Sequence, residues 1–421
     1  MTTPETAEAL TTQDGKPLKA ALRSALRREK LRALMLIAPL LFFVVVTFVA
    51  PIVDMLFRSV ENGIVSETLP KTVVALQEWD QSTGETPGEP VYVALYEDLV
   101  VAVDEKTHTR LGSRLNYEQS GISSLFRKTG RRIKRMDEDT PFKEQFIAAD
   151  KKWGEVEVWQ VLKQYSPTIT PGYYLNAVDA ELTPEGARMK DEDDRIYMFL
   201  FGRTLFLSIV ITVSCLILGY PIAFLLASLP LRTSNLLMIL VLLPFWTSLL
   251  VRTSAWKVLL QQQGVINDFL VWTRLIDDAG RLVMINNQTG TIIAMTHILL
   301  PFMILPLYSV MKTISPSYVR AAKSLGANDW TAFWRVYFPQ SVPGIGAGAI
   351  LVFILSIGYY ITPELVGGTS GIFISNRIAY HISSSLNWGL AAALGTLLLV
   401  AVLLLFVVYD KIVGIDNVKL G

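Results

Sequence analysis

Residues 315–339 read SPSYVRAAKSLGANDWTAFWRVYFP, and this stretch predicts a helix, a glycine turn and a second helix. Ser315 followed by Pro316 is typical of a helix start, because serine caps the first turn and proline suits the first helical position. Gly326 can adopt the left-handed conformation that ends a helix. Asn328 can cap the helix that follows.

The second helix of this elbow is aromatic along one face. Its apolar residues recur with helical spacing; they are Trp330, Phe333, Trp334, Tyr337 and Phe338. Pro339 is expected to end the helix, because proline lacks the N–H that a helix interior requires. A segment too polar to span a membrane and too aromatic for a free linker is expected to pack on something. The alternative is a helix that lies on lipid headgroups.

Apolar stretches flank the elbow on both sides, each about as long as the roughly 20 residues that a helix needs to cross a bilayer. These stretches are residues 34–57, 198–229, 236–258, 291–311, 344–362 and 390–409. Hydrophobic residues make up 51% of the 421 residues and charged residues 18%, which is too apolar for an ordinary soluble domain. We therefore predict an all-α membrane protein with about six transmembrane helices. The first stretch is longer than the apolar region of a signal peptide, so we expect a retained anchor.

Basic residues outside these stretches fall on one side of the predicted topology, which is typical of the cytoplasmic side. They include Arg232, Lys312, Arg320, Lys323, Arg335 and Lys411, besides a basic arm before the first stretch. Both termini are therefore expected in the cytoplasm. The predicted organisation is a basic tail (1–32), a first span (33–57), an external insert (58–197), a core of five spans (198–412) and a short tail (413–421).

The insert is long enough to fold by itself, and we predict a small periplasmic α+β module. Val91–Val103 is rich in β-branched residues and favours a strand, whereas Phe142–Gln164 favours a helix. Its basic cluster, Arg127–Arg135, is interpreted as a solvated face; the alternative is a docking surface for a soluble partner. Cys215 is the only cysteine, so no intrachain disulfide can form.

The elbow resembles the EAA loop of binding-protein-dependent ABC importer permeases. The likeness rests on Arg320-Ala321-Ala322-Lys323-Ser324-Leu325-Gly326, followed nine residues later by Val336-Tyr337-Phe338-Pro339. Four further segments make residues 198–412 look like the spermidine/putrescine-type permeases: residues 243–248 with Arg252, 264–267, 300–308 and 364–368. Two features depart from that pattern. Arg320 stands where the family usually has a glutamate, and the insert is far longer than in most members.

The resemblance implies a type I ABC importer permease fold in the bacterial inner membrane. Its partners would be two copies of an ATPase subunit, a second permease that is a different chain, a periplasmic solute-binding protein and membrane lipid. The implied contacts with the ATPase are Arg320, Ala321, Ala322, Gly326, Trp330, Phe333, Trp334 and Pro339. The sequence has no Gly-x-x-x-x-Gly-Lys-Ser/Thr loop, so we expect ATP and Mg²⁺ on the ATPase and no cofactor or catalysis in this chain.

Polar and aromatic residues at membrane depth are candidates for the substrate path, because such groups are costly there. Glu364 stands where similar polyamine permeases also carry an acid, and with Tyr359 and Tyr360 it suits an organic ammonium group. The alternative is an interfacial aromatic belt with an ordinary loop glutamate. Trp246, Thr247 and Arg252 form a second candidate group. His108, His297 and His381 lack the spacing of metal ligands, so we assign no metal.

The predicted function is that of an importer permease, most simply for a polyamine. A permease of the same family for another small solute, such as an amino-acid derivative or an opine-like compound, stays open. An ion-gradient-driven transporter would explain the spans but not the elbow. A receptor would need an output domain, and a membrane enzyme would need clustered catalytic groups. The net charge of +1 gives no indication of nucleic-acid binding.

Overall fold

The computed structural model describes residues 18–183 and 186–413, and the chain divides into two compact units, Met1–Phe57 and Arg58–Gly421. The first unit contains α1 (Leu18–Val44), a π turn (Val45–Val49) and α2 (Ala50–Arg58), the last residue of which lies past the boundary. Residues Glu29–Arg58 are long and apolar enough to span a membrane, as predicted for the first stretch.

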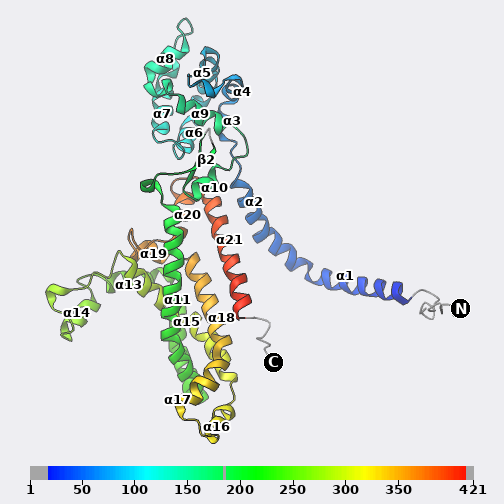
Figure 1. The fold of residues 1–421 in the computed structure, drawn as a ribbon, viewed down its shortest axis with the longest axis vertical. Coiled ribbons are helices and arrows are strands. Elements are labelled where there is room, and N and C mark those ends of the chain that lie inside the picture. The colour runs from blue at the N-terminus through cyan, green and yellow to red at the C-terminus, as the bar shows by residue number, and fades with distance from the viewer. Residues whose placement is uncertain (1–17, 184–185, 414–421) are drawn as a thin grey trace, which may run out of the picture. The chain divides into compact units, whose positions relative to one another are not determined.

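The second unit holds the insert and the remaining spans (Figure 1). The insert contains α3 (Ile64–Thr68), α4 (Pro70–Glu78), α5 (Glu89–Asp104), α6 (Thr107–Leu115), α7 (Ile122–Arg132), α8 (Phe142–Ala149), α9 (Val156–Gln164), α10 (Gly172–Ala177), β1 (Ala180–Thr183) and β2 (Gly186–Met189). The core contains α11 (Tyr197–Ser228), α12 (Leu231–Leu242), α13 (Leu249–Leu259), α14 (Val265–Trp272), α15 (Gln288–Thr313), α16 (Pro316–Ser324), α17 (Asp329–Ala332), α18 (Phe338–Gly358), α19 (Ile361–Val366), α20 (Ile374–Ser383) and α21 (Trp388–Val413).

Five helices in the described residues are long and apolar enough to cross a membrane, and a sixth span results if one bent pair is counted. The predicted fold class, an all-α membrane protein with an inserted module, is thereby confirmed. The bent pair corrects the expectation of a straight helix over 236–258: α12 and α13 meet at 94°. Pro244 lies in a short 3₁₀ turn between them, and Thr247 and Ser248 are extended. The missing N–H of Pro244 explains why the helix cannot run straight through.

The insert folds around buried aromatic rings whose polar atoms find partners inside the core. Tyr92 Oη donates to the carbonyl oxygen of Trp153 at 2.7 Å, and Trp153 Nε1 donates to Thr129 Oγ1 at 2.8 Å. Trp159 Nε1 donates to the same Trp153 carbonyl at 3.0 Å. All three rings are fully buried. This core therefore buries large aromatic groups without leaving their donors unsatisfied.

The strand predicted over Val91–Val103 is wrong, because these residues lie within α5. Val91, Leu95, Leu99 and Ala102 are buried at spacings of four, four and three, which is the period of a helix face. β-Branched content is a weak guide when tertiary packing favours the other structure. The helix expected from Phe142 to Gln164 is present but is divided into α8 and α9. The only sheet in the described residues is the antiparallel hairpin of β1 and β2, with Ala180 opposite Met189.

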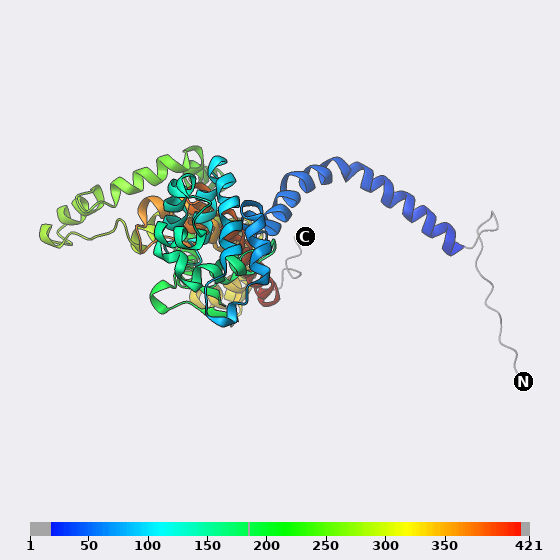
Figure 2. The same cartoon turned by 90° about the horizontal axis from the view of Figure 1, so that it is seen from above.

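Helices α11, α15 and α18 form the centre of the core, and small residues let α15 and α18 approach closely. A Cβ atom on Gly344 would lie 3.0 Å from Val310 Cβ, and one on Gly348 would lie 2.7 Å from Met303 Sδ. This four-residue spacing of glycines is typical of closely packed membrane helices. Figure 2 shows α13 and α14 projecting sideways from this centre. The insert and the elbow lie at opposite ends of it (Figure 1).

Candidate functional site

The elbow has the local structure that its sequence predicts. Ser315 Oγ accepts from the Ser317 N–H at 3.4 Å at the start of α16, and Asn328 Oδ1 accepts from the Thr331 N–H at 2.8 Å at the start of α17. Gly326 has φ +90° and donates its N–H to the Lys323 carbonyl at 3.0 Å. These caps satisfy the free backbone groups at the helix ends, so the turn between α16 and α17 is defined by its own residues.

One expectation for the elbow is wrong, because the helix does not stop at Pro339. Residues Phe333–Tyr337 form a π turn, and α18 continues from Phe338 with the proline in its first turn. The Phe338 N–H donates to the carbonyl of Phe333, five residues back, which shifts the hydrogen-bond register just before the proline. The sequence Asp329–Gly358 is therefore one continuous span of 30 residues that carries the elbow at its end.

Phe333 joins the elbow to the neighbouring span α11. Its ring centroid lies 6.2 Å from that of Tyr220 and 5.9 Å from that of Phe224. Tyr337 adds an edge contact with Phe224 at 5.1 Å. These contacts attach the elbow to α11 as well as to α18.

Trp330 and Trp334 lie on the outer side of the elbow. The two rings contact each other at 5.6 Å, but 72% of Trp330 and 44% of Trp334 are exposed. Leu325, beside the glycine turn, is 90% exposed. Of the three aromatic residues among the implied ATPase contacts, Trp330, Phe333 and Trp334, only Phe333 packs on α11. The other two belong to an exposed apolar face.

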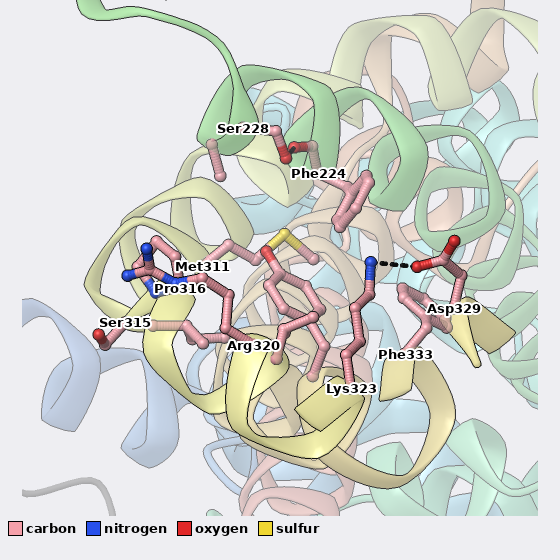
Figure 3. Close-up of a pocket in the computed structure, with 13 residues that line it drawn as sticks. Phe224, Ser228, Met311, Ser315, Pro316, Arg320, Lys323, Asp329 and Phe333 are labelled. Atoms are coloured by element: carbon pink, nitrogen blue, oxygen red, sulfur yellow. Dashed lines mark hydrogen bonds and ion pairs between the residues drawn. The ribbon is translucent and has the colours of Figure 1, made fainter. Parts of the chain in front are cut away.

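A cavity of about 580 Å³ lies behind α16, between the ends of α11 and α15 (Figure 3). Lys323 reaches across it to form an ion pair with Asp329, which ties α16 to α17. Arg320 also lines the cavity and is exposed, and it forms no ion pair within the part of the chain that the structure describes. Ala321 is exposed and Ala322 is half-buried, and their carbonyls accept from the Leu325 N–H at 3.1 and 3.2 Å.

The predicted substrate-path residues near α19 are brought together by Asn376 of α20. Asn376 Nδ2 donates to Glu364 Oε2 at 2.7 Å and to the Tyr360 carbonyl at 2.9 Å. Ser375 Oγ donates to the Tyr359 carbonyl at 2.6 Å. Glu364 and Tyr360 remain exposed, whereas Tyr359 is half-buried. Asn376 could not be predicted from local patterns, because it lies 12 residues from Glu364 in a different helix.

The second predicted group divides into two parts. Trp246 is 75% exposed, and Thr247 is exposed and donates to the Pro244 carbonyl at 2.9 Å, so both lie at the break before α13. Arg252 is half-buried in α13, which meets α19 through a hydrogen bond between Thr253 and Thr362 at 3.1 Å. A residue that sequence reasoning missed, Trp256, donates its Nε1 to His297 Nδ1 at 3.0 Å. Arg252 therefore lies on the helix that packs beside α19, whereas Trp246 and Thr247 lie at the break before that helix.

At the opposite end, a buried polar network joins the insert to the core. Arg114 and Glu118 form an ion pair at 2.5 Å with side chains only 6% and 3% exposed. Tyr165 and Asn176 each donate to Glu118 Oε2 at 2.7 Å. Burial, followed by the negative charge of Glu118, raises the pKa of Tyr165. Tyr173 accepts from Arg114 Nε at 2.8 Å.

The Arg114 network and the core residues that it reaches are called the junction here. Three contacts join the insert to the core helices at this junction. A Cβ on Gly389 of α21 would lie 2.3 Å from the Tyr173 ring, so that position has room only for glycine. Asp179 accepts from the N–H groups of Ile196 and Tyr197 at 3.0 Å and of Met198 at 2.7 Å, which caps α11. The Tyr117 ring of the insert contacts His381 of α20 at 5.9 Å, and His381 in turn bonds to Tyr197 Oη at 3.0 Å.

A bundle of long apolar helices, with a broken span and an exposed elbow between two of them, defines a multi-pass membrane transport subunit. Residues 219–414 match the family model described as the binding-protein-dependent transport system inner membrane component. The spermidine/putrescine transport system permease protein PotB of Salmonella typhimurium is 34% identical over 228 residues, which cover 54% of this chain and 79% of that protein. The PotB protein of Haemophilus influenzae is 37% identical over 216 residues, which cover 51% and 74% of the two chains.

A solved structure is also similar: a bacterial ABC transporter involved in the import of the acidic polysaccharide alginate aligns with 70% of this chain and 99% of its own at a TM-score of 0.45 and 18% identity. The extensive likeness to the PotB proteins decides the family. The chain belongs to the binding-protein-dependent transport system inner membrane components, and it is a membrane permease subunit of an ABC transporter.

Proposed function

We propose that this permease imports a polyamine such as spermidine or putrescine across the bacterial inner membrane, driven by a separate ATPase subunit. The PotB proteins are named for that transport, and their likeness covers about half of this chain. In the proposed complex, two ATPase copies bind ATP and Mg²⁺, a second and different permease completes the pathway, and a periplasmic protein delivers the solute. Both termini and the elbow face the cytoplasm, and the insert faces the periplasm.

The coupling role is supported by a difference between the two sides of the elbow, one attached to the spans and the other exposed. Phe333 and Tyr337 tie it to α11, and its continuous backbone ties it to α18, while Trp330, Trp334 and Leu325 are exposed at its tip. An exposed apolar tip on a rigidly attached elbow is suited to seat in a groove of a partner. Movement of that partner would then move two spans together, as in rigid-body switching between two states.

The candidate contact for the substrate is Glu364, held by Asn376 beside Tyr360. A carboxylate near aromatic rings attracts an organic ammonium group by charge and by cation–π interaction. Glu364→Gln keeps the hydrogen-bonding shape and removes the charge, so we expect spermidine uptake by the reconstituted complex to fall about tenfold or more, in line with the loss of a charged hydrogen bond. Basal ATP hydrolysis should be unchanged. Unaltered uptake kinetics would remove Glu364 from the site.

Arg252 favours a second candidate, the import of a solute with a carboxylate as well as an amine. It is a half-buried cation on α13, the helix bonded to α19 through Thr253 and Thr362, and its charge would repel a polyamine and attract an acid group. A competition experiment distinguishes the two candidates. If the permease imports polyamines, excess putrescine should reduce the uptake of labelled spermidine, and excess amino acids should not. The reverse pattern of competition would favour the amino-acid derivative.

A further inference from the structure

The elbow carries more positive charge than its own residues neutralise. Between positions 312 and 335 there are four cations, Lys312, Arg320, Lys323 and Arg335, and one acid, Asp329. Asp329 is already paired with Lys323, and Lys312 Nζ donates to the Ala227 carbonyl at 3.3 Å. Among the described residues, Arg320 and Arg335 have no ion-pair partner. Both arginines are exposed, so their charges are accessible to a partner.

Arg320 is the cation best placed to meet a partner. It lies in α16, which occupies the far end of the bundle beyond the last residues of α11 and α15 (Figure 1). Figure 3 shows its guanidinium pointing away from the Lys323–Asp329 pair. Exposed Tyr318, at 55%, and Leu325, at 90%, belong to the same segment. Arginine beside exposed apolar side chains is the composition enriched at the centres of protein interfaces.

We propose that Arg320 decides which ATPase this permease accepts, by pairing with a carboxylate in the docking groove of that subunit. The inference rests on the proposed function, since it requires the elbow to seat in the ATPase. A planar guanidinium can bind a carboxylate through two parallel hydrogen bonds, which gives direction as well as charge. The permease then selects an ATPase with an acidic groove and rejects one that presents a basic residue there, because like charges at an interface are costly.

The test measures binding of the cognate ATPase to the full-length permease complex in nanodiscs, at low and high salt. Arg320→Glu should weaken binding at least about tenfold at low salt, and the difference should shrink as salt screens the charges. Arg320→Lys should retain most of the binding. Arg232→Glu, the same charge change at an exposed position in α12 outside the elbow, is the matched control and should bind as the wild type does.

A compensating substitution in the ATPase shows whether weaker binding by Arg320→Glu comes from the lost ion pair or from misfolding of the permease. Replacing the groove carboxylates of the ATPase by lysine, one at a time, should restore binding to the Arg320→Glu permease at one position. Equal binding by the wild type and Arg320→Glu would overturn the inference while leaving the proposed function intact. A wild-type complex that binds no ATPase would instead refute the proposed function. A binding difference that exists only in anionic nanodiscs, and vanishes in neutral lipid, would assign Arg320 to a lipid headgroup and overturn the inference.

Discussion

The two ends of the permease core treat their polar and aromatic groups in opposite ways. At the junction with the insert, Arg114 and Glu118 are buried together, and Tyr165, Asn176 and Tyr173 bond to them, which leaves Arg114 Nη2 without an acceptor. At the elbow, the Lys323–Asp329 pair is exposed, and Trp330 and Leu325 face outward. Buried groups that bond mostly to one another gain little from a further partner, whereas an exposed apolar and charged tip gains more from one.

The difference separates residues that stabilise the fold from residues that couple the permease to its partner. Substitutions at the junction should reduce stability, with transport falling only because less folded protein remains. Substitutions at the elbow should leave stability nearly unchanged and abolish the coupling between ATP hydrolysis and transport. The expected loss of stability is therefore largest at the junction and smallest at the elbow.

Arg114→Ala should have the largest effect, because it leaves the buried Glu118 carboxylate without its counter-charge. Breaking a buried ion pair by removing one partner costs about 3–5 kcal/mol. The measurement is denaturant unfolding of the purified protein followed by the fluorescence of the buried Trp153 and Trp159. Arg127→Ala is the control, since Arg127 is exposed and donates only to Ser123, and it should change stability by about 0.5 kcal/mol at most. Equal stability of the two variants would show that the network is dispensable.

Acid should weaken the same junction through His381. Burial, and then the charge of Arg377, lowers the pKa of His381 to about 4. The folded state therefore binds fewer protons than the unfolded state, whose histidine has an ordinary pKa of about 6.5. Stability from this group is complete above pH 6.5 and is lost as the pH falls toward 4. At pH 5 the loss should be about 1–2 kcal/mol relative to pH 7.

The control for this pH dependence is His381→Gln, which has no titration in that range. Its unfolding free energy should be lower than that of the wild type at pH 7 but should change less between pH 7 and pH 5. Parallel pH profiles of the two proteins would place the acid sensitivity at another group.

Local patterns in the sequence predicted the spans and the caps of the elbow, because both depend on neighbouring residues. Ser315, Gly326 and Asn328 act where their chemistry indicates. The predictions that failed did so for other reasons. The buried face of α5 depends on insert packing, and the helix passes Pro339 because a π turn shifts its register. Asn376 beside Glu364 and His381 beside Tyr197, 184 residues apart, come together only in the folded chain.

Gly326→Asp should have the smallest effect on stability and the largest on coupling. Gly326 has φ +90° with nothing within 4 Å of an added Cβ, and aspartate tolerates the left-handed region better than most residues, so the cost should be about 1 kcal/mol. Gly84→Asp is the matched control, since that glycine has φ +68° and equally open surroundings in the insert. Uptake should fall to background in Gly326→Asp and stay normal in Gly84→Asp.

The most direct test is to reconstitute the purified permeases in proteoliposomes with and without the ATPase, and to measure uptake of labelled spermidine together with ATP hydrolysis. The account predicts that uptake requires both the ATPase and ATP, and that Gly326→Asp abolishes uptake while the protein remains folded in the membrane. Uptake by the permeases alone, driven by an ion gradient and unaffected by Gly326→Asp, would contradict it.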